Sequence, residues 1–391
     1  MTTGYQMYDP IFGTKDLADE FITDAWLVDK YVGNTMFTWG PNYYGELGLG
    51  SSGNSYSSPV QVGALTTWKQ VSMGQSNLGA IKTDGTLWVC GYGFYGQNAQ
   101  GNTSSYNSPV QVGNLTNWKQ ISYNNSGYNA WGALKTDGTL WACGSSAGTG
   151  IGANYSSPIQ IGTLNNWKQI YYAATIAAIQ TNGTLWVWGV GGSGQIGNNS
   201  TGNYSTPIQV GSSTIWHQVS VLNTTTMAIQ NNGTLWGWGN NAQGQIGNGT
   251  ITSYSSPIQV GTLTNWKQVA TGQTWTAAIK TDGTLWVWGS NPNGELGLGV
   301  ATTISYSSPV QVGALTNWKQ ISTGQISAGA IKTDGTLWTW GAVQSNATGT
   351  STVGYYSSPV QVGSLTNWKS IATTLGLGGP FAAITYTELS T

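Results

Sequence analysis

Nearly the whole chain is built from one repeat of about fifty residues, and this repeat limits the possible folds more than any other feature. Seven prolines mark it at intervals of 49 to 52 residues, each within a variant of YSSPVQVG. These prolines are Pro59, Pro109, Pro158, Pro207, Pro257, Pro309 and Pro359. About ten residues later, every copy carries a tryptophan, usually within NWKQ. A period near 50 residues is typical of propellers and solenoids.

Each copy contains four short candidate strands. After the proline strand and the Trp-Lys strand comes a strand with an Ala-Ile pair, then an Asp-Gly or Asn-Gly pair, then a TLWVWG strand. Asp-Gly or Asn-Gly between two alternating runs predicts a hairpin with a type I′ turn. In TLWVWG, Trp186 and Trp188 share one face of the strand, while Leu185 and Val187 share the other.

The repeat is offset relative to the ends of the chain. The TLWVWG strand has six obvious copies after the Ala-Ile strands, and the last Ala-Ile strand, at 382–384, has none behind it. Residues 33–40, GNTMFTWG, match DGTLWVWG and supply the seventh copy at the other end. Pairing the two ends removes exposed sheet edges, which benefits only a closed ring. The sequence therefore predicts an all-β, closed seven-bladed β-propeller of four-stranded antiparallel blades at 34–391, preceded by a short helical arm at 1–33.

Composition agrees with a folded ring of low charge. Charged residues make up 6% of the chain, against roughly 25% in typical globular domains. Twelve lysines, no arginine and a net charge of -1 argue against a nucleic-acid-binding surface. The 21 tryptophans and 20 tyrosines can bury a large apolar area, which favours a folded chain over a disordered one.

The search for targeting signals and the two cysteines give little information about function. The first ten residues have neither a basic nor an apolar region of the kind that begins a signal peptide. No run of about 18 apolar residues occurs, so we expect no membrane insertion. Cys90 and Cys143 occupy the same repeat position in successive copies, and we expect two packed free thiols.

Two stretches resemble the regulator of chromosome condensation repeat. They are WGPNYYGELGLG at 39–50 and WGSNPNGELGLG at 288–299, and both fit the pattern WG-x-N-x-x-G-x-L-G-x-G. The resemblance covers residues 34–391 and implies a seven-bladed propeller. Two departures stand out: this chain lacks the histidine that the family usually has before the Ala strand, and Glu46 and Glu295 replace the common glutamine.

The sequence gives no sign of catalysis. The single histidine, His217, stands in a lysine position of the repeat, where it is a surface variant. One histidine supports neither a triad nor a metal cluster. Glu46 and Glu295 belong to distant copies, so a carboxylate pair is not expected. The glycine-rich runs at 91–96 and 192–197 precede a proline strand rather than a helix, which argues against dinucleotide binding. We therefore expect no enzyme, cofactor or metal.

A variable patch precedes each Ala-Ile strand. Its residues change while the framework barely does, and in a ring all seven patches emerge on one face near the axis. Unconstrained drift of surface loops is one interpretation, and a binding face with aromatic anchors is the other. The candidate binding residues are Gln75, Asn77, Asn125, Tyr128, Trp131, Tyr172, Thr225, Trp275 and Gln325.

The N-terminal arm differs in kind. Residues 14–32 predict one amphipathic helix, with Thr14 as the N-cap, acidic residues in the first turns and Lys30 in the last turn. Six of the thirteen acidic residues lie before residue 31. The helix either caps the ring's own face or docks the protein onto a larger assembly. Its candidate anchor residues are Leu17, Phe21, Ile22, Ala25, Trp26 and Val28.

Three functional hypotheses follow. The family resemblance implies a nucleotide-exchange factor for a small GTPase, but the repeat spacing leaves no room for the wedge such factors use. It also implies a soluble protein-binding or inhibitory propeller, which would be cytoplasmic. The leading hypothesis, based on composition, is a virion component of a phage tail, fibre or capsid surface, made in the host cytoplasm. Its arm at 1–33 would bind other virion proteins, and its loop face would bind a host-surface or other protein ligand.

Overall fold

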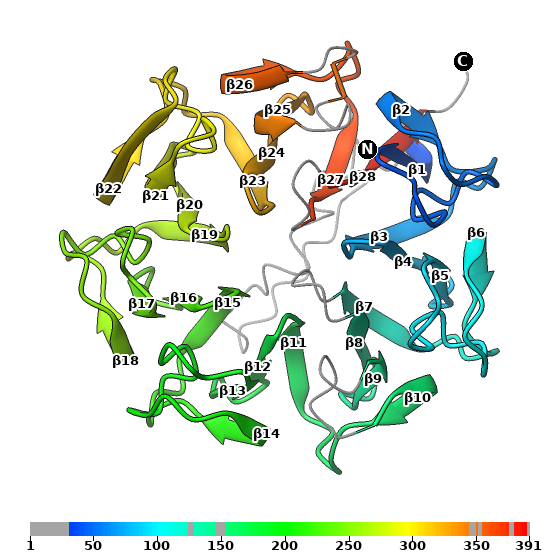
Figure 1. Cartoon of the computed structure of the whole chain (residues 1–391), viewed down its shortest axis with the longest axis horizontal. Helices are drawn as coiled ribbons and strands as arrows, with labels where there is room; N and C mark the ends of the chain where they lie inside the picture. The colour runs from blue at the N-terminus through cyan, green and yellow to red at the C-terminus, as the bar shows by residue number, and fades with distance from the viewer. Residues whose placement is uncertain are drawn as a thin grey trace, which may run out of the picture.

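The computed structural model describes residues 31–123, 129–145, 153–343, 349–350, 354–374 and 379–388. Seven four-stranded antiparallel sheets stand around one axis, as Figure 1 shows. This confirms the predicted all-β, closed seven-bladed propeller. The described residues contain no helix; residues 1–30 of the predicted helical arm lie outside them, and residues 31–33 belong to a strand.

The strands form four concentric sets, named here from the axis outward (Figure 1). The innermost are the Trp-Lys strands: β3 Trp68–Met73, β7 Trp118–Tyr123, β11 Trp167–Tyr171, β15 Trp216–Leu222, β19 Trp266–Thr271, β23 Trp318–Thr323 and β27 Trp368–Ala372. The second are the Ala-Ile strands: β4 Asn77–Lys82, β8 Ala130–Lys135, β12 Thr175–Gln180, β16 Thr225–Gln230, β20 Trp275–Lys280, β24 Ser327–Lys332 and β28 Phe381–Glu388.

The two outer sets complete each blade. The third strands are β1 Tyr31–Gly40, β5 Leu87–Gly91, β9 Leu140–Gly144, β13 Leu185–Gly189, β17 Leu235–Gly239, β21 Leu285–Asn291 and β25 Leu337–Val343. The outermost are the proline strands: β2 Tyr56–Gln61, β6 Tyr106–Gln111, β10 Tyr155–Gln160, β14 Tyr204–Gln209, β18 Tyr254–Gln259, β22 Thr302–Gln311 and β26 Gly354–Gln361. Proline is tolerated at a sheet edge because it need not donate to a further strand.

One blade joins the two ends of the chain, in the strand order β2-β1-β28-β27. Met36 pairs with Ile384 and Trp39 pairs with Phe381, so the N-terminal strand completes the C-terminal half-repeat as predicted. Tyr31 also pairs with Glu388, so β1 begins three residues before the predicted start of the propeller at 34. The register with β28 extends the strand into residues that the sequence pattern assigned to the end of the helix.

The core lies between blades. Trp186 and Trp188 pack with Trp167 on one side of their blade, while Leu185 and Val187 pack into the next interface, as the period of two predicts. Trp167 and Trp186 meet edge to face, with ring centroids 6.3 Å apart at 85°. This geometry suits the aromatic quadrupole. Similar edge-on or tilted pairs recur in every blade interface, for example Trp266 with Trp286.

The hairpin turns differ from the predicted type. Gly183 N donates to Gln180 O at 2.9 Å and Gln180 N donates to Thr184 O at 3.0 Å, which closes a loop one residue longer than a type I′ turn. Only Gly183 has positive φ, +77°, as in a type I turn with a glycine bulge. The Asn182 side chain accepts hydrogen bonds from the backbone N–H and the hydroxyl of Thr184. Asp or Asn is therefore selected for capping the turn rather than for tolerating positive φ.

Glutamines of the innermost strands tie neighbouring blades together. Gln120 Nε2 donates to Ile170 O at 2.8 Å, and Ile170 N donates to Gln120 Oε1 at 3.1 Å. The same two-bond clamp recurs at Gln70, Gln218 and Gln268. In the last innermost strand Ser370 takes this position, and its hydroxyl is buried without a hydrogen-bond partner.

Cys90 and Cys143 are buried free thiols, as expected. Burial raises the pKa of both, which keeps them protonated and unreactive. Within the described ranges, no helix is long and apolar enough to cross a membrane.

Candidate functional site

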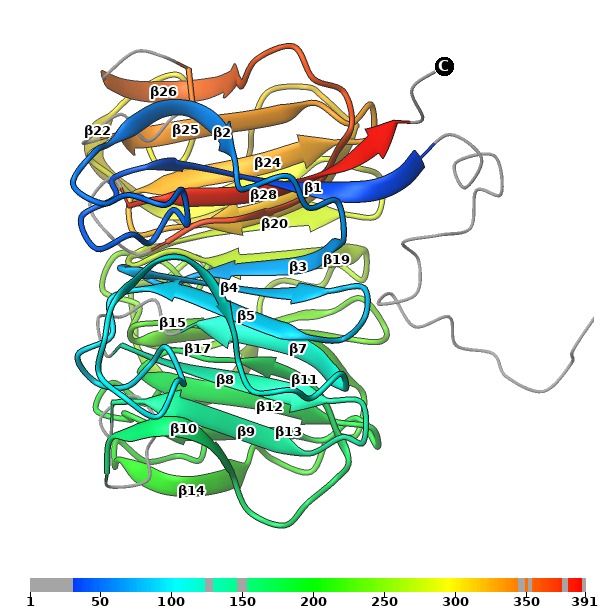
Figure 2. The same ribbon diagram turned by 90° about the vertical axis from the view of Figure 1, so that its right-hand side faces the viewer.

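The two ends of the ring carry different structures. The loops between innermost and second strands, and those between third and outermost strands, share one end, which we call the loop face. The start of β1 and the end of β28 lie at the opposite end, the rear face (Figure 2). The variable patches that the structure describes therefore gather on one face near the axis, as predicted.

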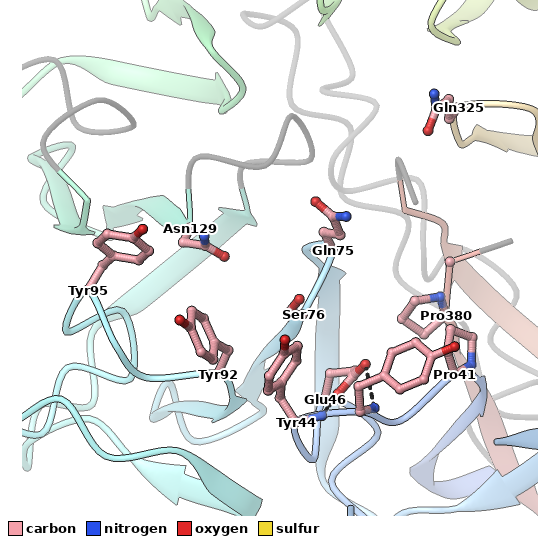
Figure 3. A pocket seen from close by; sticks show the side chains of 12 residues that line it. Pro41, Tyr44, Glu46, Gln75, Ser76, Tyr92, Tyr95, Asn129, Gln325 and Pro380 are labelled. Carbon is pink, nitrogen blue, oxygen red and sulfur yellow. Dashed lines mark hydrogen bonds between the residues drawn. The ribbon is translucent and has the colours of Figure 1, made fainter. Parts of the chain in front are cut away.

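The loop face is hollowed over the blades of β1 to β6. The hollow has a volume of about 580 Å³ and opens beside the axis (Figure 3). Its lining residues come from six separate loops: Pro41, Tyr43, Tyr44, Glu46, Gln75, Ser76, Tyr92, Tyr95, Asn129, Gln325, Gly379 and Pro380. Among these described lining residues, Glu46 is the only carboxylate and there is no lysine or histidine.

An aromatic cluster lies at the hollow, and all its members except Phe94 line it; Phe94 packs against Tyr92 and Tyr95. We define it as Tyr43, Tyr44, Tyr92, Phe94 and Tyr95. Tyr43 is 61% exposed and Phe94 is 64% exposed, high values for side chains of this size. The ring centroids of Tyr44 and Tyr92 lie 4.7 Å apart, and those of Phe94 and Tyr95 lie 5.2 Å apart. The contacts join two loops of adjacent blades into one apolar surface.

The aromatic cluster is confined to two of the seven copies. Loops 41–45 and 92–96 read PNYYG and YGFYG, whereas the corresponding loops read VGGSG at 190–194, NNAQG at 240–244 and SNPNG at 290–294. Sequence reasoning missed these residues because it looked for variation only before the Ala-Ile strands. Aligning the loops that follow WG would have revealed them.

Buried polar groups hold the first aromatic loop. Both carboxylate oxygens of Glu46 accept backbone N–H groups, from Tyr43 at 3.0 Å and from Tyr44 at 2.6 Å. Burial raises the pKa of Glu46, and these hydrogen bonds partly offset the rise. Gly45 has φ +83°, and a Cβ there would meet Asn107 of the neighbouring blade at 2.4 Å. The loop is thus fixed before any ligand arrives.

The second aromatic loop is held in a similar way. Asn77 Nδ2 donates to Tyr92 O at 2.6 Å, and Gln97 Oε1 accepts the N–H of Tyr95 at 2.9 Å. Asn98 Nδ2 donates to Gly91 O at 2.9 Å and to Ser104 O at the same distance. Asn77, Gln97 and Asn98 are almost fully buried. These hydrogen bonds hold the backbone of the loop in place, although Gln97 Nε2 itself is buried without a hydrogen-bond partner.

The nine predicted binding residues fall into three groups: those that line the hollow, those outside the described residues, and those that are buried. Gln75 is exposed and Gln325 is half-buried, and both line the hollow. Asn125 and Tyr128 lie outside the described residues. The other five are buried and do not present their side chains to a partner; they are Asn77, Trp131, Tyr172, Thr225 and Trp275. Whether the face binds anything stays a prediction.

The buried five support the framework instead. Trp131 pairs across the sheet with Cys143, which stands where other copies have tryptophan. Its Nε1 donates to Gln97 O at 2.8 Å, the bond that Trp238 makes to Gln195 O at 2.9 Å. Trp131 therefore takes over the role of the missing tryptophan.

The remaining three support loops or neighbouring blades. Trp275 Nε1 donates to Gln325 O at 3.0 Å in the next blade. Thr225 Oγ1 donates to Asn240 O at 2.8 Å, which fixes a loop from below. Tyr172 fills the space beside Gly132, where a Cβ would lie 2.3 Å from its ring.

The arrangement suits binding rather than chemistry. Among the described residues, no group of three His, Cys, Asp or Glu side chains could hold a metal ion. Glu46 and Glu295 lie in different blades, with the blade of β23 to β26 between them. The glycine-rich runs at 91–96 and 192–197 lead into β6 and β14 rather than into helices.

Comparisons with known proteins agree with the fold. The family model of the regulator of chromosome condensation (RCC1) repeat matches residues 34–81, 182–229, 232–279 and 282–331. A second model of the same repeat matches residues 266–295. The E3 ubiquitin-protein ligase HERC2 of human and that of mouse are each 26% identical over 188 residues. That alignment covers 46% of this chain but only 4% of the length of these relatives.

Solved structures share the architecture. Human WBSCR16 superposes with a TM-score of 0.80 at 17% identity, covering 91% of this chain and 100% of that chain. Prp20p from Saccharomyces cerevisiae superposes with a TM-score of 0.79 at 16% identity, covering 95% of this chain and 96% of that one. At these identities the likeness establishes the fold alone.

Proposed function

Because the chain belongs to the RCC1 repeat family, we propose that it is a protein-binding propeller whose loop face holds the partner. The observation that carries this proposal is the exposed aromatic cluster on two rigid loops beside a hollow of about 580 Å³. Aromatic side chains supply large contact areas at low entropic cost, and they dominate the hot spots of protein interfaces.

The relatives favour protein partners. Prp20p has binding properties toward Gsp1p and histones, and the crystal structure of yeast RCC1 (Prp20) contains it bound to Kap60. These partners belong to Prp20p, and only the class of ligand is proposed for this chain. Hydrogen bonds hold the backbone of both aromatic loops in place, which favours a partner that docks on a preformed surface.

The two other hypotheses receive less support. The proposal of an exchange factor rests on the fold alone, because the identity to the yeast protein is 16%. The proposal of a virion component attached through residues 1–33 rests on composition, and the named human, mouse and yeast proteins do not favour it. Residues 1–30 of its attachment arm lie outside the described residues. Absence of catalysis likewise stays a prediction.

The test compares four forms of the protein in pull-downs from a lysate of the source organism, quantified by mass spectrometry. They are the full-length chain, a chain without residues 1–30, a loop-face variant and a rear-face control. The loop-face variant is Tyr44→Gln with Phe94→Ala, residues that the loop at 240–244 carries at the same positions. The control is Leu65→Ser with Leu115→Ser, which removes two exposed apolar side chains from the rear face.

The proposal expects one protein to be retained equally by the full-length chain, the truncated chain and the rear-face control. The loop-face variant should bind this protein about tenfold or more weakly, measured by calorimetry with the purified partner. Equal binding by the loop-face variant would refute the proposal. Loss of the partner on removal of residues 1–30 alone would favour attachment through the arm.

A further inference from the structure

A basic ring surrounds the axis at the rear face. The second residue of every innermost strand is basic, and the innermost strands stand side by side around the axis (Figure 1). We define the basic ring as Lys69, Lys119, Lys168, His217, Lys267, Lys319 and Lys369. Trp68 pairs with Lys82, at the end of β3 opposite the loop face, so these positions lie at the rear.

Neighbours in the basic ring interact electrostatically. The pKa of Lys369 is lowered, first by burial and then by the positive charges of Lys69 and Lys319 on either side. Lys69 and Lys319 are exposed, as are Lys119 and Lys267. Like charges held this close favour an anionic ligand that relieves their repulsion.

Several other charged groups of the described propeller have partners of their own. Lys82 Nζ lies 3.5 Å from the ring centroid of Trp88, and Lys135, Lys280 and Lys332 repeat this contact. The turn aspartates, such as Asp84, accept hydrogen bonds from their own threonines. Glu46 is buried at the other face. By sequence, residues 31–391 carry a formal net charge of +3 and residues 1–30 carry −4.

The rear face also exposes apolar side chains outside the basic ring. Each connection from an outermost to an innermost strand crosses this face, and six of them carry a leucine that is 44% to 47% exposed. These leucines are Leu65, Leu115, Leu164, Leu263, Leu315 and Leu365. The rear face therefore combines cations near the axis with leucines farther out.

The chain enters the ring beside these groups. Asn34 N donates to Thr66 O at 2.6 Å, which places the start of β1 against the connection that carries Leu65. Lys369 Nζ donates to Asn34 Oδ1 at 3.3 Å. The described chain therefore begins beside both the basic ring and an exposed leucine.

We propose that residues 1–30 of this chain dock on the rear face, with their carboxylates on the basic ring and their apolar residues against the exposed leucines. The segment contains six acidic residues together with Phe21, Ile22 and Trp26, so it matches the face in charge and in apolar character. A short tether gives an effective concentration in the millimolar range, so individually weak contacts suffice. This docking leaves the loop face free and does not depend on the proposed function.

The test uses the full chain in three forms. The arm variant carries Asp16→Asn, Asp19→Asn, Glu20→Gln and Asp24→Asn. The matched control also removes four acidic groups, through Asp84→Asn, Asp137→Asn, Asp282→Asn and Asp334→Asn. Asparagine already caps the equivalent turns at Asn182 and Asn232, so the control preserves the hairpins. Thermal unfolding verifies that all three forms are folded.

Two measurements are made on each form. Carbodiimide joins carboxylates to amines in direct contact, and mass spectrometry identifies the joined residues. Mixing isotopically labelled and unlabelled chains separates links within a chain from links between chains. Acetylation rates then report the accessibility of each lysine, with Lys82, Lys135, Lys280 and Lys332 as lysines outside the basic ring.

Docking predicts links within one chain between acids of residues 1–30 and lysines of the basic ring, in the native chain and in the control. At about 1 M NaCl, where the screening length is ~3 Å, their yield should fall about tenfold. Ring lysines should acetylate faster in the arm variant only. Absence of these links, links only between different chains, or equal acetylation in all three forms would overturn the proposal.

Discussion

Replacing Gln120 by alanine removes one clamp between two blades and measures what such clamps contribute. The change deletes the 2.8 Å bond to Ile170 O and the 3.1 Å bond from Ile170 N. Each neutral hydrogen bond contributes about 1 kcal/mol net, and the half-buried peptide groups of Ile170 lose their partner. We expect the free energy of unfolding to fall by about 2–3 kcal/mol.

This loss is measurable in a chain of 391 residues. At about 2.1 cal/mol/K per residue, the entropy of unfolding is about 0.8 kcal/mol/K, so the melting temperature should fall by about 3 °C. Urea unfolding followed by tryptophan fluorescence gives the free energy, since the many interblade tryptophans report on blade separation.

Ser370→Ala is the matched control, because the chain itself lacks the clamp there. The Ser370 hydroxyl is buried without a hydrogen-bond partner, so its removal breaks no bond. We expect a change of less than about 0.5 kcal/mol. If Gln120→Ala costs no more than Ser370→Ala, the clamps do not stabilise the ring.

Three further predictions use the same comparison between copies. Burial raises the pKa of Glu295 to about 7 from a usual 4.5, so its ionisation destabilises the folded state as pH rises from 4.5 through 7. Glu295→Gln, which introduces the residue that Gln245 provides in the preceding copy, should therefore raise stability by about 2–3 kcal/mol at pH 8 and by almost nothing at pH 4, measured by urea unfolding at both pH values. Ser370→Gln should add the missing clamp and raise the melting temperature by about 1–2 °C by calorimetry, whereas Ser370→Glu, which has no amide donor, should not. Trp131→Ala should cost about 3–5 kcal/mol, and adding Cys143→Trp should recover part of that loss, which a double-mutant cycle would detect.

The ring was predictable because one signal recurs seven times. The prolines and the tryptophans of the Trp-Lys strands fix the same feature in all seven copies, and the turn glycines do so in six. The offset of the repeat predicted the pairing that joins Met36 to Ile384. The turn type was not predictable from the Asp-Gly pair alone. The turn type depends on how many residues the hairpin loop contains. The hydrogen bond from Gln180 N to Thr184 O shows that the loop has one residue more than a type I′ turn.

The candidate site was harder to predict because two kinds of residue vary between copies: exposed residues of the loops, and buried residues that support those loops. Asn77 and Thr225 are the first residues of β4 and β16, so a short hairpin has already turned their side chains inward. They vary with the loop that each supports. Gln75 lies two residues earlier and is exposed. Two positions along the same loop are enough to change a buried supporting residue into an accessible one. The length of each hairpin sets which of these positions is exposed.

Trp131 shows why sequence variation alone is a poor guide to binding surfaces in such repeats. It is the most conspicuous aromatic residue of its patch, yet it is fully buried and compensates for Cys143 on the next strand. Tyr44 and Phe94 replace small or polar residues of other copies, and unlike Trp131 they are exposed. Since leaving apolar surface in contact with water is unfavourable, an exposed aromatic gain is the stronger sign of a partner. By this criterion the aromatic cluster, rather than the variable patch as a whole, is the part of the loop face where binding should be sought.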